Sequence, residues 1–223
     1  MQAHVTRTRR IGVAIVALAA AVAASACLTK ETTHTVLIAR DGTITWTVLE
    51  DIIGSDAKAA SDRTREEADY LAAAWRGDHS PAVALWHLGA LDVRTGVLGA
   101  TAPFVVRTEG RFGRLDEVMN RFAAAAGARS VSTLVRRDGI ATWTWTLEED
   151  SDALDRDDTV DALSDVLDGG RFLLERGRFV SASGFTLSTC RIAVLKIPED
   201  QPQVRLELSW SEDDDSPCLS QSK

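Results

Sequence analysis

Polar and apolar residues alternate without a break from Thr43 to Val48, TITWTV, which predicts a strand with one buried face. Asp41-Gly42 separates this strand from an apolar one that we expect to begin at Thr35. Asp-Gly between two such runs is the pair favoured in two-residue hairpin turns. A two-residue turn places Leu37 opposite Trp46, and we expect both side chains to face the core.

The same hairpin returns 97 residues later. Residues 134–144, LVRRDGIATWT, match residues 37–47 at seven of eleven positions, including the Asp-Gly turn and the Trp. The turn again sets a Leu opposite the Trp, and an acidic loop and a helix are expected after both copies. We therefore predict an internal repeat, with a first ββα-type unit over 35–130 and a shorter second unit over 131–211.

Apolar residues at helical spacing, closed by glycines, predict the helices between and after the hairpins. These helices are expected at about 62–76, 80–88 with Ser80 as N-cap, 115–126 and 158–168. Further strands are expected near 93–98, 104–108, 171–175, 178–182, 185–197 and 203–210. Hairpins separated by single helices favour an α+β fold, an antiparallel sheet built from hairpins with helices packed on one face.

The first 26 residues follow a different pattern. Arg7, Arg9 and Arg10 precede an unbroken apolar or small run over 11–26, and the segment contains no acid. A basic head followed by a short apolar core is typical of a secretory signal peptide. The run is shorter than the roughly 20 residues of a membrane-spanning helix. We expect residues 1–26 to be removed on export.

The end of this segment, Ala24-Ser25-Ala26-Cys27, resembles the lipobox of bacterial lipoproteins. The family prefers Leu three residues before the cysteine, where this chain has Ala24. The resemblance implies that signal peptidase II cuts before Cys27 and that its thiol carries a diacylglyceryl group, with fatty acyl chains such as palmitate. The same Ala-Ser-Ala also suits ordinary signal peptidase I, which would leave Cys27 a free thiol on a secreted protein.

Cysteine count favours lipidation, since the chain has three cysteines and an odd thiol is a liability outside the cytoplasm. With Cys27 lipidated, Cys190 and Cys218 remain as an even pair. A bridge between them would hold an acidic tail, residues 212–223, against the strand over 185–197. Two separate thiols are the alternative. Residues 27–34 are expected to form a short lipidated tether.

Charge limits the partners of the processed chain. Loss of the three N-terminal arginines leaves 22 of the 25 basic residues against 33 acidic ones, a net charge of −11 over 197 residues. Such a chain is a poor nucleic-acid binder and gains nothing from anionic lipid surfaces. We expect attachment through the lipid alone, on the extracytoplasmic side of the cell envelope. By resemblance to the lipoprotein sorting rule, Leu28 after the cysteine permits delivery to an outer membrane where the host has one.

No catalytic residue, metal site or cofactor is predicted. The acidic run from Glu148 to Asp158 offers carboxylates for Ca²⁺, but Leu154 occupies a ligand position and the loop has no glycine, so a solvated loop is expected. His34, His79 and His87 have no spacing typical of a zinc site. Motifs for a nucleophile elbow, a dinucleotide or a phosphate loop are absent from the sequence.

Six tryptophans are expected in the core, because they lie on alternating strands and apolar helix stripes. The alternative is that some of them line an apolar groove for a lipid or peptide. Trp145 is the best candidate, since the first copy has the smaller Val48 there. The sequence therefore predicts a non-enzymatic binding or structural envelope protein with an envelope protein or lipid as partner. An apolar-ligand carrier and a hydrolase without a recognisable motif are the alternatives.

Overall fold

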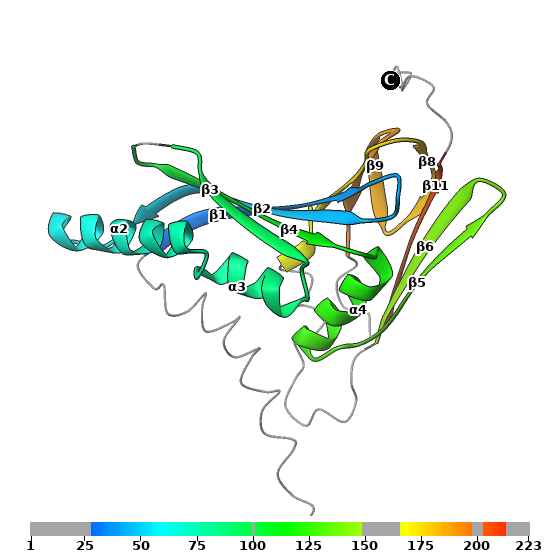
Figure 1. The fold of residues 1–223 in the computed structure, drawn as a ribbon, viewed down its shortest axis with the longest axis horizontal. Coiled ribbons are helices and arrows are strands. Elements are labelled where there is room, and N and C mark those ends of the chain that lie inside the picture. The colour runs from blue at the N-terminus through cyan, green and yellow to red at the C-terminus, as the bar shows by residue number, and fades with distance from the viewer. Residues whose placement is uncertain (1–27, 100, 149–165, 198–202, 213–223) are drawn as a thin grey trace, which may run out of the picture.

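The computed structural model describes residues 28–99, 101–148, 166–197 and 203–212, which form an α+β fold (Figure 1). The helices within these ranges are α2 (Ala60–Arg76), α3 (Ser80–His87) and α4 (Leu115–Ala126). The strands are β1 (Leu28–Ile38), β2 (Ile44–Ser55), β3 (Asp92–Val97), β4 (Phe104–Phe112), β5 (Arg129–Arg137), β6 (Ile140–Glu148), β7 (Arg171–Leu174), β8 (Arg178–Ser183), β9 (Phe185–Thr189), β10 (Ile192–Leu195) and β11 (Gln203–Ser211).

The strands build two sheets. The larger has seven strands in the order β3-β4-β2-β1-β7-β10-β9, and the smaller has four in the order β5-β6-β11-β8. Neighbouring strands are antiparallel, except that β7 runs parallel to β1, with Thr35 opposite Arg171. The predicted fold class, an antiparallel arrangement of hairpins with helices, is confirmed.

The helices pack on one face of the larger sheet (Figure 1). Inward positions on β2 meet two of them, because Trp46 lies against Phe122 of α4 and Glu50 accepts a hydrogen bond from Tyr70 of α2. Helix α3 approaches β4 closely at Gly110, where an added Cβ would lie 3.2 Å from Leu85. The contacting residues occupy alternate positions of β2 and β4, so their side chains lie on one face of the sheet. The opposite face carries no described helix.

Two clusters of buried side chains hold the layers together. The main core joins the larger sheet, α4 and the smaller sheet, and it takes side chains from both 35–130 and 131–211. A smaller core of Ile53, Ala74 and Val106 lies under α2. The two sequence units therefore contribute to one shared interior, and each completes the burial of the other's apolar face.

The first hairpin differs from its predicted register. Val36, and not Leu37, stands opposite Trp46. The turn is longer than two residues because the Asp41 carboxylate accepts hydrogen bonds from the Thr43 N–H (2.9 Å) and hydroxyl (2.7 Å). A shift of one residue exchanges the faces of a strand, so Val36 is buried and Leu37 lies on the outer face.

The second hairpin keeps its predicted register, with Leu134 opposite Trp143. Its turn has two residues, Asp138 and Gly139, both with positive φ (53° and 75°), as a type I′ turn requires. The two hairpins lie in different sheets and use different turns. Their origin by duplication remains a prediction.

Strand β1 begins at Leu28, seven residues earlier than the expected start at Thr35. Leu28 stands opposite Ser55, and the pairing continues through a bulge to the rest of the hairpin. The segment expected to be a free tether between Cys27 and the domain is therefore hydrogen-bonded strand from residue 28 onward.

Three smaller expectations also change. The run 185–197, predicted as one strand, is two strands joined by a turn at 190–191. Helix α3 has His79 as its N-cap in place of Ser80, with no side-chain cap hydrogen bond. The helix predicted over 158–168 lies mostly outside the described residues.

Candidate functional site

The residues predicted from the lipobox and the cysteine count lie largely outside the described part of the chain. Cys27 and Cys218 are both outside it. Cys190 lies in the turn between β9 and β10, where its carbonyl accepts a hydrogen bond from the Phe179 N–H at 2.7 Å. The lipid anchor and the Cys190–Cys218 bridge therefore remain predictions.

The acidic run also falls largely outside the description, which ends at Glu148 in β6 and resumes at Val166. Across the described ranges, no group of three or more His, Cys, Asp and Glu side chains is placed to hold a metal ion. Within those ranges, too, no helix has the length and apolar character needed to cross a membrane.

The tryptophans divide into two groups. Trp46, Trp143, Trp145 and Trp210 are buried, and Trp145 stacks on Trp143 with ring centroids 6.1 Å apart, so it packs in the core and lines no groove. The core prediction is wrong for Trp75 and Trp86, which are 71% and 50% exposed.

The exposure of Trp75 follows from helix geometry. The side of α2 that faces the sheet is set by the contacts of Tyr70 and Ala74, four residues apart. Trp75 lies one residue, or about 100° of rotation, beyond Ala74 and points to the surface. Trp86 and Val83, three residues apart on α3, are exposed together.

A buried polar cluster, unpredicted from the sequence, lies where β1, β2, β4 and α2 meet. We call it the polar cluster; it consists of Lys30, Glu50, Tyr70, His79 and Thr108. Glu50 could have been identified, because it continues the inward alternation of Ile44, Trp46 and Val48 along β2. A carboxylate in that series predicts a buried partner.

Glu50 is the centre of the polar cluster, and only 1% of its surface is exposed. The Lys30 ammonium forms an ion pair with one of its carboxylate oxygens, and the Tyr70 hydroxyl donates a hydrogen bond to the other. The Lys30 Nζ also lies 3.4 Å from the Tyr70 oxygen and 5.1 Å from the ring centroid. Both carboxylate oxygens are thus engaged, and three elements are tied together.

His79 extends the polar cluster toward β4. Its Nε2 lies 2.8 Å from Thr108 Oγ1 and 4.0 Å from a Glu50 oxygen, while its Nδ1 is buried and has no hydrogen-bond partner among the described residues. Burial lowers the pKa of His79, although the negative charge of Glu50 opposes the shift. The imidazole is therefore neutral at physiological pH.

Tyr70 is held as a phenol. Burial, and then the neighbouring Glu50 charge, raise the pKa of its hydroxyl above the ordinary value of 10. The polar cluster thus carries one positive and one negative charge, both paired. Its chemistry is that of a closed ionic clamp between strands and helix.

A second histidine, the partly buried His34, contacts the main core. The Trp46 indole N–H donates a hydrogen bond to His34 Nδ1 at 3.1 Å, so His34 carries its proton on Nε2 when neutral. Burial lowers the pKa of His34 to about 4. His34 lies in the segment 28–34, so this bond also fixes β1 to the domain.

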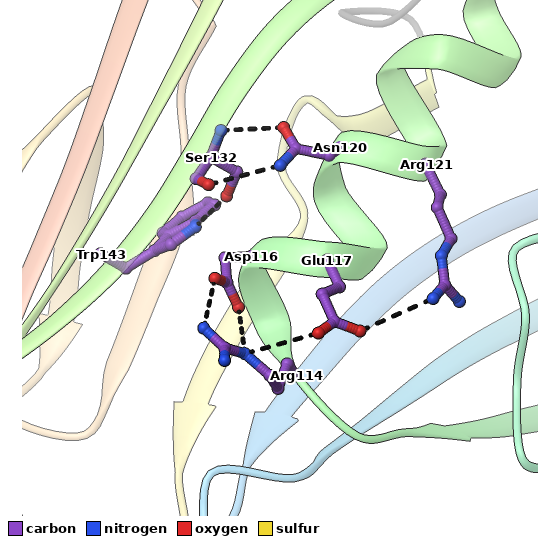
Figure 2. A network of polar contacts seen from close by, with 7 residues as sticks. All are labelled: Arg114, Asp116, Glu117, Asn120, Arg121, Ser132 and Trp143. Atoms are coloured by element: carbon purple, nitrogen blue, oxygen red, sulfur yellow. Dashed lines mark hydrogen bonds and ion pairs between the residues drawn. The ribbon is translucent and has the colours of Figure 1, made fainter.

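Helix α4 is joined to the smaller sheet by the polar contacts drawn in Figure 2. The Asn120 amide oxygen accepts the Ser132 N–H at 2.8 Å, and its nitrogen donates to the Ser132 carbonyl at 3.3 Å. The Ser132 hydroxyl accepts the indole N–H of Trp143 at 2.7 Å. At the start of α4, Arg114 forms ion pairs with Asp116 and Glu117 on the surface.

Comparison with known proteins yields one structural likeness. No protein-family model matches the chain, and no curated protein matches it. Among solved structures, the folded domain of LppM from Mycobacterium tuberculosis is similar, at 13% sequence identity and a TM-score of 0.37, over 83% of this chain and 91% of that one. Both values are low, so this likeness assigns no function to the chain.

Proposed function

We propose that this chain is an exported bacterial lipoprotein, held on the extracytoplasmic side of an envelope membrane by acyl chains on Cys27. Its α+β domain serves as a binding or structural component of the envelope. The N-terminal pattern supports export, since a basic head and a 16-residue apolar run end directly before Cys27. The two or three acyl chains of a bacterial lipoprotein suffice for stable anchoring.

The observation that carries the proposal is where the domain begins. Leu28, the first described residue and one residue after the predicted lipid attachment point, is already paired with Ser55 in the sheet. The polar cluster fixes this strand, because Lys30 is paired to the buried Glu50. An anchor on Cys27 therefore acts on a strand that is already locked into the sheet, and the domain lies directly at the bilayer without a free linker.

The packing of the tryptophans supports a binding or structural role over that of an apolar-ligand carrier. The aromatic side chains of the main core contact one another, with Trp143 stacked on Phe172 at 5.5 Å and close to Phe185 at 6.1 Å. A carrier needs such side chains to line an open cavity. Large apolar groups are instead presented at the surface, Trp75 and Trp86 among them, which favours contact with another envelope component.

Metabolic labelling with an alkyne analogue of palmitate tests the proposal. The wild-type chain, expressed in a bacterial host, is expected to take up the label and to sediment with membranes. Cys27→Ala is expected to lose the label, while the matched variant Cys190→Ala keeps it. An unlabelled wild-type chain in the soluble fraction would contradict the proposed anchor.

A further inference from the structure

Three aliphatic side chains line up at the end of the larger sheet where the chain enters it. We call Ile52, Val105 and Leu98 the aliphatic row; Ile52 lies on β2, Val105 on β4, and Leu98 directly follows β3. The Leu98 N–H donates to the Val105 carbonyl at 2.8 Å, which sets these two residues opposite each other. Glu50 and Ile53 of β2 pair with Val106 and Phe104 of β4, so the two bulge residues between them, Asp51 and Ile52, lie opposite Val105.

The aliphatic row faces away from the interior. The chain neighbours Ile53, Val106 and Val97 all pack into the small core under α2. Successive residues on a strand point to opposite faces, so Val105 lies on the face without helices. Leu98 is its cross-strand neighbour and shares that face, and Ile52 lies beside Val105 in the bulge of β2. Ile52 is 49% exposed and Leu98 is 60% exposed.

Ile52 is held outward at a conformational cost. Its φ is +54°, a value that β-branched residues rarely adopt, and it lies in a bulge between β2 and β4. The bulge is stabilised by the Asp51 carboxylate, which accepts the Ile52 N–H at 2.7 Å. Strain that presents a large apolar side chain to solvent indicates a functional surface.

The same end of the sheet receives the membrane anchor. Leu28 pairs with Ser55, only three residues along β2 from Ile52. The strand order β3-β4-β2-β1 places Leu98 three strands from Leu28, about 15 Å at the usual spacing of strands. Cys27 directly precedes Leu28, so any bilayer attached there lies within reach of the whole row.

Charged residues border the aliphatic row, because Asp51 beside Ile52 and its cross-strand neighbour Glu31 on β1 are exposed at the same edge. Two residues beyond Val105, on the same face of β4, Arg107 is exposed and ion-paired with Glu109. Arg94 on β3 is exposed and bonds to Asp92 at 2.8 Å. An edge that carries both aliphatic and charged side chains suits the interfacial layer of a membrane, where apolar groups reach the upper acyl chains and charges stay among the headgroups.

We infer that the aliphatic row inserts into the lipid surface to which Cys27 is attached, so that the larger sheet stands with this end in the bilayer interface. The inference rests on the proposed function, since the anchor supplies the bilayer. The acyl chains provide the attachment, and insertion of the three side chains fixes the orientation of the larger sheet on the membrane. The face of α2 and α3 that carries Trp75 and Trp86 then stays in water, free for an envelope partner.

Spin labels on the full acylated chain in phosphatidylcholine–phosphatidylglycerol vesicles test this orientation. The label is attached at Leu98→Cys, with Val135→Cys on β5 as the matched control, since Val135 is 59% exposed and belongs to the smaller sheet. Trp75→Cys reports on the helix face. The unsubstituted chain gives the background from native thiols. Collisions with oxygen and with a water-soluble nickel complex measure the depth of each label.

The Leu98→Cys label is expected to collide with oxygen and to be protected from nickel at least fivefold relative to Val135→Cys and Trp75→Cys. Equal nickel access at positions 98 and 135, or protection at position 75 instead, would overturn the inference. Mass of the same preparation tests the anchor separately. An unacylated chain off the vesicles contradicts the proposed function and with it the inference, whereas an acylated chain with a water-exposed Leu98→Cys label contradicts the inference alone.

Discussion

Lys30 and Glu50 form an ion pair between β1 and β2 that fixes the start of the domain three residues after Cys27. The two partners are unequally buried, because the Lys30 side chain is 18% exposed and that of Glu50 is 1% exposed. The attachment strand is thus held by a buried charge, whereas a hydrogen-bonded strand end alone would fray readily.

Loss of the Lys30 charge is expected to be more damaging than loss of the Glu50 charge. Lys30→Met leaves a carboxylate buried with only the Tyr70 hydroxyl as partner, and should lower the free energy of unfolding by about 3–5 kcal/mol. Glu50→Gln leaves an ammonium that can still reach water, so the loss should be smaller. Urea unfolding of each variant measures the difference.

The surface ion pair of Arg65 with Asp62 provides the control for this comparison, since their side chains are 67% and 44% exposed. Arg65→Met should leave the urea midpoint unchanged, because exposed pairs contribute little. Equal effects of Lys30→Met and Arg65→Met would show that the polar cluster does not fix β1.

His34 should make the domain less stable in mild acid. Its pKa is about 4 in the folded chain against 6.5 ordinarily, so the unfolded chain binds the proton more readily between these values. The contribution of neutral His34 to the free energy of unfolding is complete above pH 6.5. It is lost as the pH falls toward 4, by at most about 3 kcal/mol.

The variant His34→Asn tests this pH dependence, because Asn keeps an acceptor for the Trp46 indole N–H without titrating. Urea unfolding at several pH values should show a shallower loss between pH 6.5 and 4 in the variant than in the wild type. Parallel curves for the two proteins would be inconsistent with the lowered pKa of His34.

Asn120 is expected to protect the exposed edge of β5. Its amide pairs with both the N–H and the carbonyl of Ser132, as a neighbouring strand would. Asn120→Leu leaves both groups unpaired and should cost about 1–3 kcal/mol. Thermal unfolding measures the cost, and light scattering should detect edge-to-edge association.

Glu117→Gln is the matched control on the same helix, since Glu117 is 53% exposed and makes only surface ion pairs (Figure 2). It should leave both stability and light scattering unchanged. A monodisperse Asn120→Leu protein of wild-type stability would refute the protective role.

Gly177 is expected to tolerate no side chain. Its φ is +82°, and an added Cβ would lie 2.0 Å from the Ser211 carbonyl oxygen of β11. Gly177→Ala should destabilise the smaller sheet by about 2–3 kcal/mol. Gly96→Ala on β3 should leave the melting temperature unchanged, because no atom would lie within 4 Å of the added Cβ. Similar melting temperatures for the two variants would argue against this close approach of the β7–β8 turn to β11.

Helices and strands are predictable from the sequence where they pack against an apolar core. The alternation through Trp46 identifies β2, and Gly127, with φ of 82°, ends α4 as expected. The start of β1 is missed because its inward residues include Lys30 and His34, which pair with buried polar groups. A strand that faces a polar interior has no hydrophobic alternation to detect.

The polar cluster was only partly predictable for a related reason. Glu50 interrupts the apolar inward positions of β2, which predicts a buried charge there. Its partners Lys30 and Tyr70 are each 20 residues away, in opposite directions along the chain. Tyr70 lies on the apolar stripe of α2, whereas nothing in the local pattern of Lys30 distinguishes it from a surface residue. Only the packing of α2 against the sheet brings the two together.

Intact mass of the membrane-extracted protein tests whether acyl chains on Cys27 anchor the domain directly before β1. We expect a wild-type chain that begins at Cys27 and carries added acyl mass, and loss of that mass in Cys27→Ala. A soluble, unmodified chain beginning at Cys27 would show that no lipid anchors the domain.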